Sequence, residues 1–183
     1  MTGSALPASV VAKVAAAAGK YLRLADPGSG SGAGGAEADL LARLAASAVL
    51  TAEAFCGQVF VARGFAAVLP GGGGWQLLPA RPVTAIGAVS VGGVVLPVDA
   101  YAVDIDADGA GWVRLTAGGG PVAVSYTAGP ADGFGDVPAP VAQGIVALTA
   151  HLFEARDGAT QPPAAVAALW RPFRRVRLME PVR

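Results

Sequence analysis

VPAPVAQGIVALTAHLFEARDG, residues 137–158, is the stretch of sequence that decides the fold. Its large apolar residues recur every three or four positions, which places them along one side of an α-helix with about 3.6 residues per turn. These residues are Val141, Ile145, Leu148 and Leu152. Asp136 suits the N-cap, prolines suit the first turn, and Gly158 suits the end. The pattern predicts a helix over 137–156 with one buried face.

Two further helices are predicted before this one. Residues 6–24 form an Ala-rich pattern with Val10, Val14, Ala17 and Tyr21 on one side. Residues 37–57 carry a broad apolar face, which can pair with the helix over 137–156. The segment between them, 26–35, reads DPGSGSGAGG and is predicted to be a flexible connection.

Between the second and third predicted helices, over about 59–128, the hydrophobic period changes to two. VFVARGFAAVL (59–69) and WQLLPA (75–80) are predicted to be strands joined by a loose hairpin, and VTAIGAVSV-GG-VVLPV (83–98) a hairpin with a Gly-Gly turn. YAVDI, WVRL and VAVSYTA continue the series. These segments predict an antiparallel β-unit of about six short strands.

Composition bounds the class of protein. A chain of 183 residues is long enough for one domain with a sizeable core. It is 54% hydrophobic, but its longest uncharged windows fall short of the ~20 apolar residues that span a bilayer. Lys13 lies where a signal peptide would be apolar, so secretion is not expected. Cys56 is the only cysteine, which fits a reducing compartment.

The net charge is zero, but the charges are segregated along the chain. Six aspartates lie between Asp99 and Asp136 against Arg114 alone, whereas five arginines lie from Arg171 onward against Glu180. This polarity favours head-to-tail contact between copies, or an acidic partner for the basic end.

Two short motifs are false leads. Gly30, Gly32 and Gly35 match G-x-G-x-x-G, but a helix precedes them where a dinucleotide site needs a strand. The run from Asp104 through Asp106 and Asp108 opens like a calcium loop, yet strands flank it and Leu115 replaces the bidentate Glu. An Asp-rich hairpin turn is the better prediction for that run.

The residues for catalysis are sparse. His151 is the only histidine, and no serine lies in G-x-S-x-G, so the sequence offers poor material for a hydrolase triad. His151 and Glu154 lie three apart on one helix, but two ligands without a third seldom hold a metal. Cys56, at the end of an apolar helix, is predicted to be a core residue. No enzyme, cofactor or metal site is expected.

The C-terminal part combines arginines with aromatic residues. Residues 164–170 predict two helical turns that end at Pro172, and 171–183 predict an extended arm. The candidate partner-binding residues are Trp170, Arg171, Phe173, Arg174, Arg175, Val176 and Arg177. They could anchor in a groove of another protein, stack on nucleic-acid bases, or fold back onto the chain's own helices with the arginines exposed. A zero net charge is unusual for a nucleic-acid-binding domain.

Several segments, taken in order, resemble the head-to-tail connector (adaptor) proteins of tailed bacteriophages and phage-like gene transfer agents. They are LLARLAASAVLTAEAFCGQVF (40–60), LLPARPVTAIGAVSV (77–91), VSYTAGPADGFGDVPAPVAQGIVALTAHLFEARDG (124–158) and PPAAVAALWRPFRRVRL (162–178). Each piece is short, and the resemblance lies in their order. It covers most of the chain from Leu40 onward.

From the residues alone we expect an α+β fold: a small bundle of three to four helices with an inserted antiparallel β-unit and an extended C-terminal arm. The resemblance implies a single connector domain over 1–183 and a ring of about a dozen copies beneath the portal protein. It further implies that the arm docks on the portal, that the ring receives a tail-side connector or stopper protein, and that DNA passes through the channel without sequence-specific binding. The expected location is the head–tail interface of a virion or virus-like particle. A nucleic-acid-binding role for the arm is the alternative.

Overall fold

The computed structural model describes residues 2–24, 33–116, 118–155 and 161–175. Its contacts divide the chain into two compact units. The β-unit consists of Met1–Ala5 and Val59–Asp132, and the helical unit of Leu6–Gln58 and Gly133–Arg183. The expected α+β fold, with a β-unit inserted between helices, is confirmed. No helix in the described ranges is long and apolar enough to cross a membrane.

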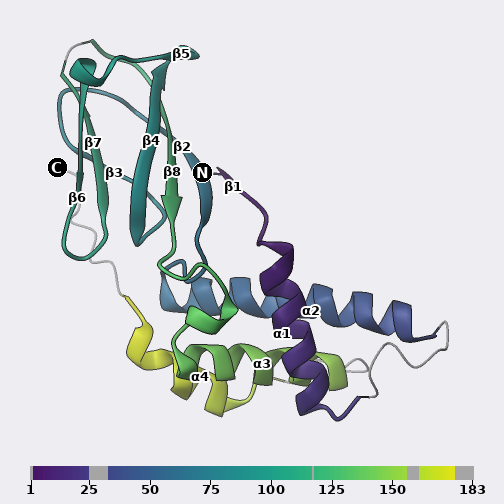
Figure 1. The fold of residues 1–183 in the computed structure, drawn as a ribbon. Coiled ribbons are helices and arrows are strands. Elements are labelled where there is room, and N and C mark those ends of the chain that lie inside the picture. Colours follow the sequence, from purple (N-terminus) through teal and green to yellow (C-terminus); the bar gives the residue numbers. More distant parts are fainter. Residues whose placement is uncertain (1, 25–32, 117, 156–160, 176–183) are drawn as a thin grey trace. The chain divides into compact units, whose positions relative to one another are not determined.

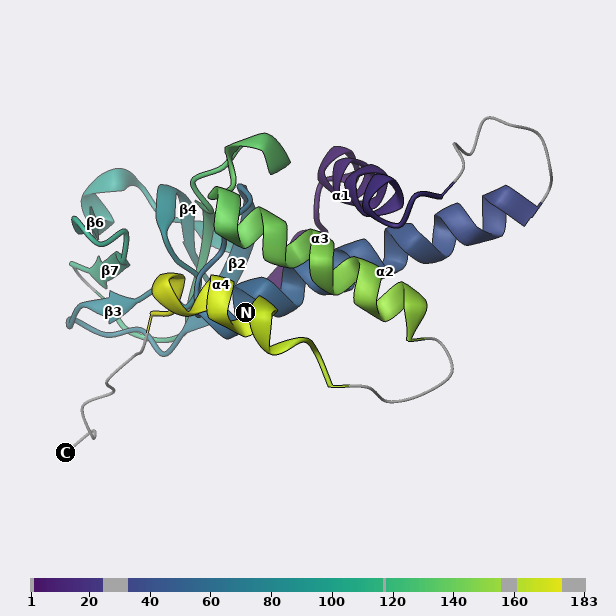
Figure 2. The ribbon, with the colours of Figure 1, turned by 90° about the horizontal axis from the view of Figure 1, so that it is seen from below.

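The helical unit is built around one central helix (Figures 1 and 2). Its helices are α1 (Ala8–Tyr21), α2 (Ala33–Cys56), α3 (Ala139–Glu154) and α4 (Ala164–Trp170), with short 3-10 turns at η2 (Phe134–Asp136) and η3 (Arg171–Phe173). Helix α3 packs against α1, α2 and α4. The predicted pairing of α2 with α3 is therefore confirmed.

Helix α3 buries most of the predicted face. Val141, Ile145 and Leu148 are buried, whereas Leu152 is half-buried. The helix begins at Ala139, because Pro138 precedes it in extended backbone with φ −50° and ψ 130°. The predicted cap by Asp136 is wrong: its carboxylate accepts a hydrogen bond from the Gly133 N–H at 3.1 Å and closes the turn of η2 instead.

The first two helices differ from prediction at their margins. Helix α1 buries Val10, Val14 and Ala18, which are spaced by one helical turn, so the predicted Ala17–Tyr21 side is rotated away and Tyr21 is 66% exposed. Helix α2 begins at Ala33, so the end of the predicted connection is helical. The rest of that connection, with Gly30 and Gly32, lies outside the described residues.

The β-unit contains two antiparallel sheets. The five-stranded sheet has the order β1 (Thr2–Gly3), β2 (Arg63–Leu69), β8 (Val122–Ala128), β4 (Val83–Val91) and β5 (Val94–Val95). The three-stranded sheet has the order β3 (Gln76–Leu77), β7 (Gly111–Leu115) and β6 (Tyr101–Ile105). The predicted β4–β5 hairpin is confirmed, with positive φ at Gly92 and Gly93.

The two sheets share one core. Phe65, Val89 and Val124 of the larger sheet belong to the same buried cluster as Val113 and Leu115 of the smaller one. The segment that follows β3 is also tied to the larger sheet, because the Ala80 N–H donates to the Tyr126 hydroxyl of β8 at 3.1 Å. The sheets therefore pack face to face, and each turns an outer face away from the core.

The predicted hairpin between residues 59–69 and 75–80 is wrong. Strand β2 pairs along its whole length with β8, and β3 pairs with β7. The glycine-rich loop between β2 and β3 carries the chain from one sheet to the other, with positive φ at Gly71 and Gly72. Alternating hydrophobicity predicts that a segment is a strand, but it does not select the partner strand.

Candidate partner-binding surface

Trp170, at the end of α4, anchors the start of the predicted arm. Its side chain is only 3% exposed, and its indole N–H donates to the Val141 carbonyl of α3 at 3.2 Å. The ring also lies 5.8 Å from that of Phe55 on α2, with the planes inclined by 55°. One indole thus joins three helices of the helical unit.

Gly144 of α3 provides the space for that indole. A Cβ built on Gly144 would overlap Nε1 of Trp170 and lie 2.9 Å from Cε2 of its ring. A helix-interior glycine costs up to about 1 kcal/mol relative to alanine, so its presence is explained by this close approach.

Beyond Trp170 the chain folds back onto the C-terminal end of α2. The Arg175 N–H donates to the Cys56 carbonyl at 2.8 Å, and Nε2 of Gln58 donates to the Phe173 carbonyl at the same distance. Gly57 takes φ +66°, and a Cβ there would lie 2.8 Å from the Arg175 carbonyl oxygen. These contacts satisfy a carbonyl at the end of α2 and fix the path of residues 171–175.

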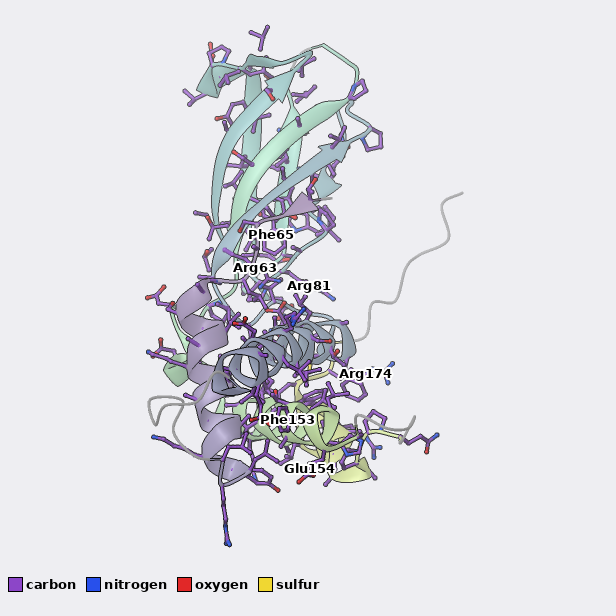
Figure 3. The ribbon with its side chains drawn as sticks, turned by 90° about the vertical axis from the view of Figure 1, so that its right-hand side faces the viewer. Arg63, Phe65, Arg81, Phe153, Glu154 and Arg174 are labelled. Atoms are coloured by element: carbon purple, nitrogen blue, oxygen red, sulfur yellow. The ribbon has the colours of Figure 1, made fainter. Side chains whose placement is uncertain are left out.

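Residues 171–175, held in this way against α2, form a basic surface. We call this surface the ledge and define it as Arg171, Phe173, Arg174 and Arg175. The three arginines are exposed and Phe173 is half-buried. The Arg174 guanidinium lies 5.7 Å from the centre of the Phe55 ring, a cation–π contact that restrains the guanidinium. Figure 3 labels Arg174 at the surface of the helical unit. Of the three alternatives for this segment, folding back with exposed arginines describes residues 171–175.

The structure divides the predicted partner-binding residues into three groups. Trp170 was predicted to be a partner-binding residue. Its indole is instead buried among α2, α3 and α4, so it belongs to the core. Arg171, Phe173, Arg174 and Arg175 form the ledge. Val176 and Arg177 lie outside the described residues. With Trp170 buried, the ledge has only the half-buried Phe173 for stacking on a base.

Cys56 lies under the ledge and is fully buried. Its thiol donates to the Trp170 carbonyl at 3.7 Å, and burial raises the pKa of the thiol to about 11. The side chain is therefore a neutral thiol at pH 7. Its burial confirms the prediction that Cys56 is a core residue.

His151 and Glu154 line a groove of about 580 Å³ in the helical unit. The remaining lining is mostly apolar, with Tyr21, Phe134, Val166 and Leu169 among the larger side chains, and it includes no aspartate or cysteine. Within the ranges that the structure describes, no three His, Cys, Asp or Glu side chains gather as metal ligands. The groove has the chemistry of a packing surface.

The Asp-rich run forms the predicted hairpin turn between β6 and β7. The Asp106 carboxylate accepts hydrogen bonds from the Ala110 N–H at 2.8 Å, the Asp108 N–H at 3.0 Å and the Trp112 indole at 3.3 Å. The bond from Ala110, followed by that from Trp112, lowers the pKa of Asp106. Asp106 therefore stabilises its own turn, while Asp104 lies exposed beside it.

Comparison with solved structures gives matches along nearly the whole chain. A chain from the neck of an empty gene transfer agent particle, computed with C6 symmetry, matches with a TM-score of 0.72 and 27% identity over 98% of both chains. The chain has the fold of a gene transfer agent neck subunit. A chain from the neck of the native particle, computed with C12 symmetry, matches with a TM-score of 0.69 and 22% identity over 98% of both chains. One from the virion of a native particle matches with a TM-score of 0.67 and 29% identity, over 96% of this chain and 95% of that one.

The neck-subunit fold covers both units, since the matches span 96–98% of the chain. The predicted resemblance to connector proteins of phage-like particles is therefore confirmed. No protein-family model matches the sequence, and a search of the curated proteins finds no match.

Gln58 and Gly144 hold the ledge of this neck-subunit fold in place, and the sequence analysis missed both. Gly144 had a readable signal, because an isolated glycine within a strong helical pattern often marks a close approach. Gln58 had none, since its partner is a backbone carbonyl 115 residues away.

Proposed function

We propose that this protein is a head–tail adaptor of a gene transfer agent or phage-like particle, located at the head–tail interface. In this role copies form a ring beneath the portal, extend the DNA channel and receive the next tail component. The observation that carries the proposal is the end-to-end similarity to chains from the neck of gene transfer agent particles. The role is structural and requires no catalytic residue, metal or cofactor.

A ring of identical copies is supported by the symmetry of the similar structures. They are necks computed with C6 and C12 symmetry. We propose a ring of about a dozen copies, in which each copy contacts the next through two different surfaces, as cyclic symmetry above two-fold requires.

We propose that the ledge meets the portal protein. Its arginines are exposed, and the path of residues 171–175 is fixed by hydrogen bonds to α2, so little order has to be gained on binding. Arginine is enriched among residues that dominate binding energy at protein interfaces. Carboxylates of the partner are the expected acceptors, because guanidinium groups bind them bidentately.

In this role DNA passes through the ring and is not bound by sequence. The chain carries no net charge, which supports passage over tight binding, because strong non-specific DNA affinity comes from excess positive charge. A tail-side connector or stopper protein is the expected partner on the side of the ring away from the portal.

The direct test is deletion of the coding sequence in the cell that produces the particle. We expect filled or empty heads that lack tails, loss of DNA delivery, and recovery of both when the intact gene is supplied in trans. Electron microscopy and a DNA-transfer assay provide the readouts. Tailed particles with normal DNA delivery in the deletion strain would contradict the proposal.

A further inference from the structure

The β-unit has two outer faces of contrasting character. On the outer face of β2, β8 and β4, six small residues form a patch here called the smooth face: Gly64, Ala66, Ala85, Gly87, Ser125 and Thr127. The outer face of β3, β7 and β6 is here called the aromatic face: Trp75, Asp104, Trp112 and Arg114.

The smooth face is mostly exposed yet carries no charge on these six residues. An antiparallel sheet that faces water normally alternates buried apolar residues with polar ones. Here six outward positions hold Gly, Ala, Ser or Thr, with Val68, 70% exposed, beyond them on the same side of β2. Together with β1 the six line a shallow hollow of about 490 Å³. The backbone of the sheet is thus accessible to large side chains of a partner.

The aromatic face has the opposite character. Trp75 is 45% exposed, and the Arg114 guanidinium lies 4.9 Å from the centre of its ring. Trp112 is held by its indole hydrogen bond to Asp106. Tryptophan and arginine are the residue types that most often dominate interface energetics, so this face suits the protruding side of a contact.

The two faces point in opposite directions. The inner residues of both sheets share one core, so the smooth face and the aromatic face lie on opposite sides of the β-unit (Figures 1 and 2). A cyclic ring needs two different, roughly opposed surfaces on each copy, and this arrangement provides them within one unit.

We propose that, in the ring, the smooth face of one copy receives the aromatic face of the next copy. This inference rests on the proposed adaptor function. Large side chains from one copy contact small residues on the next, so the two faces can pack closely without large side chains meeting one another. Within its own copy, Arg114 stays stacked on Trp75, and the Asp106 carboxylate keeps its three hydrogen bonds when the two faces meet.

The area of this contact determines whether two copies associate on their own or only in the assembled ring. Three strands about 4.8 Å apart and seven residues long present roughly 330 Å² of face. A stable pairwise interface needs about 800 Å² per partner. Two copies joined only through these faces therefore associate weakly, and the contact becomes stable where each copy is also held by the portal and by both neighbours.

Thiol cross-linking in assembled particles tests the contact. Asp104→Cys places a thiol on the aromatic face and Ala66→Cys places one on the smooth face, while native Cys56 is fully buried. With a short bis-maleimide, the double variant should give a ladder of covalent multimers longer than dimers. Each single variant should give no such ladder, because a contact between two different surfaces never brings identical positions together.

A control pair and a truncation separate this contact from chance proximity. Ala66→Cys combined with Val94→Cys at the exposed β4–β5 turn should give no ladder. Trp75→Ala should lower the amount of protein in particles by at least about tenfold, whereas Val98→Ala, at a position 82% exposed, should not.

Failure of the face-to-face contact can be distinguished from failure of the proposed adaptor function. If the double variant is present in particles but gives no ladder, or if the control pair gives the same ladder, the face-to-face contact is overturned and the adaptor role stands. If the wild-type chain is missing from purified particles, the adaptor role itself fails, and this inference fails with it.

Discussion

At the residue scale, Trp170 and Gly144 are a matched pair. The indole approaches α3 so closely that no side chain fits at position 144. Gly144→Ala must therefore displace Trp170 and should lower the free energy of unfolding by about 1–3 kcal/mol, as overpacking does. Urea unfolding measures this loss. Gly135→Ala is the control, because a Cβ there meets nothing within 4 Å. Equal stability of both variants would mean that the indole does not occupy this site.

Cys56 makes a pH-dependent contribution to stability. Its pKa is raised by burial from 9.0 to about 11 in the folded chain, so the folded state holds the thiol proton more tightly than the unfolded state. Stability from this group is complete below pH 9 and falls as the pH rises from 9 to 11. Cys56→Ser, which does not ionise in this range, should show a smaller loss of melting temperature over the same interval. Identical slopes for both proteins would contradict the assignment.

The ledge can be tested by reversing its charge without touching the core. Arg171→Glu with Arg174→Glu should leave the melting temperature nearly unchanged, since both side chains are exposed. It should reduce binding to portal-bearing heads by at least about tenfold, because two charge-assisted contacts become repulsive. Lys20→Glu with Arg43→Glu makes the same change in net charge at exposed positions elsewhere. If both variants bind equally, the ledge is not the portal contact.

At the scale of elements, the sequence predicted helices better than strand partners. The 3.6-residue period identified α1, α2 and α3, because burial of one face leaves a local trace that needs no partner. The partner of β2 is β8, about 60 residues later, and no local pattern encodes that distance. For the ledge, composition found the arginines, but the burial of Trp170 depended on Val141 and Phe55, which lie far along the chain.

Gly129, where β8 ends, is a position where an element boundary depends on one residue. It takes φ +104°, and a Cβ there would lie 2.5 Å from the Val61 carbonyl carbon. Gly129→Ala should destabilise the chain by more than about 1 kcal/mol, combining backbone strain with a clash. Gly118→Ala has the same kind of positive φ, +86°, but open space, and therefore measures the strain alone. Equal melting temperatures for the two variants would show that the clash with the Val61 carbonyl adds nothing to the backbone strain.

At the scale of the whole molecule, the charge polarity of the sequence follows the two units. The β-unit carries five aspartates against three arginines and neither lysine nor glutamate, whereas the ledge and every lysine belong to the helical unit. The sequence anticipated the polarised charge, whereas the division into two compact units was not anticipated. The assignment of residues 1–5 to the β-unit was not anticipated, because two residues of β1 are too few to give a pattern.

The isolated chain is expected to be monomeric. The faces of the β-unit offer less area than a stable pair requires. Sedimentation at micromolar concentration should therefore give the mass of one chain, 18.0 kDa. A stable ring formed by the purified protein alone would show that larger contacts exist than those described.

The hydrogen bond between the Arg175 N–H and the Cys56 carbonyl also fixes the point from which the rest of the chain continues. Residues 176–183 begin at a point held by α2, and a fully extended chain advances at most about 3.3–3.6 Å per residue. Any partner site touched by these eight residues must lie within roughly 28 Å of that point. The distance from the end of α2 to any such site therefore has an upper limit, whatever conformation these residues adopt.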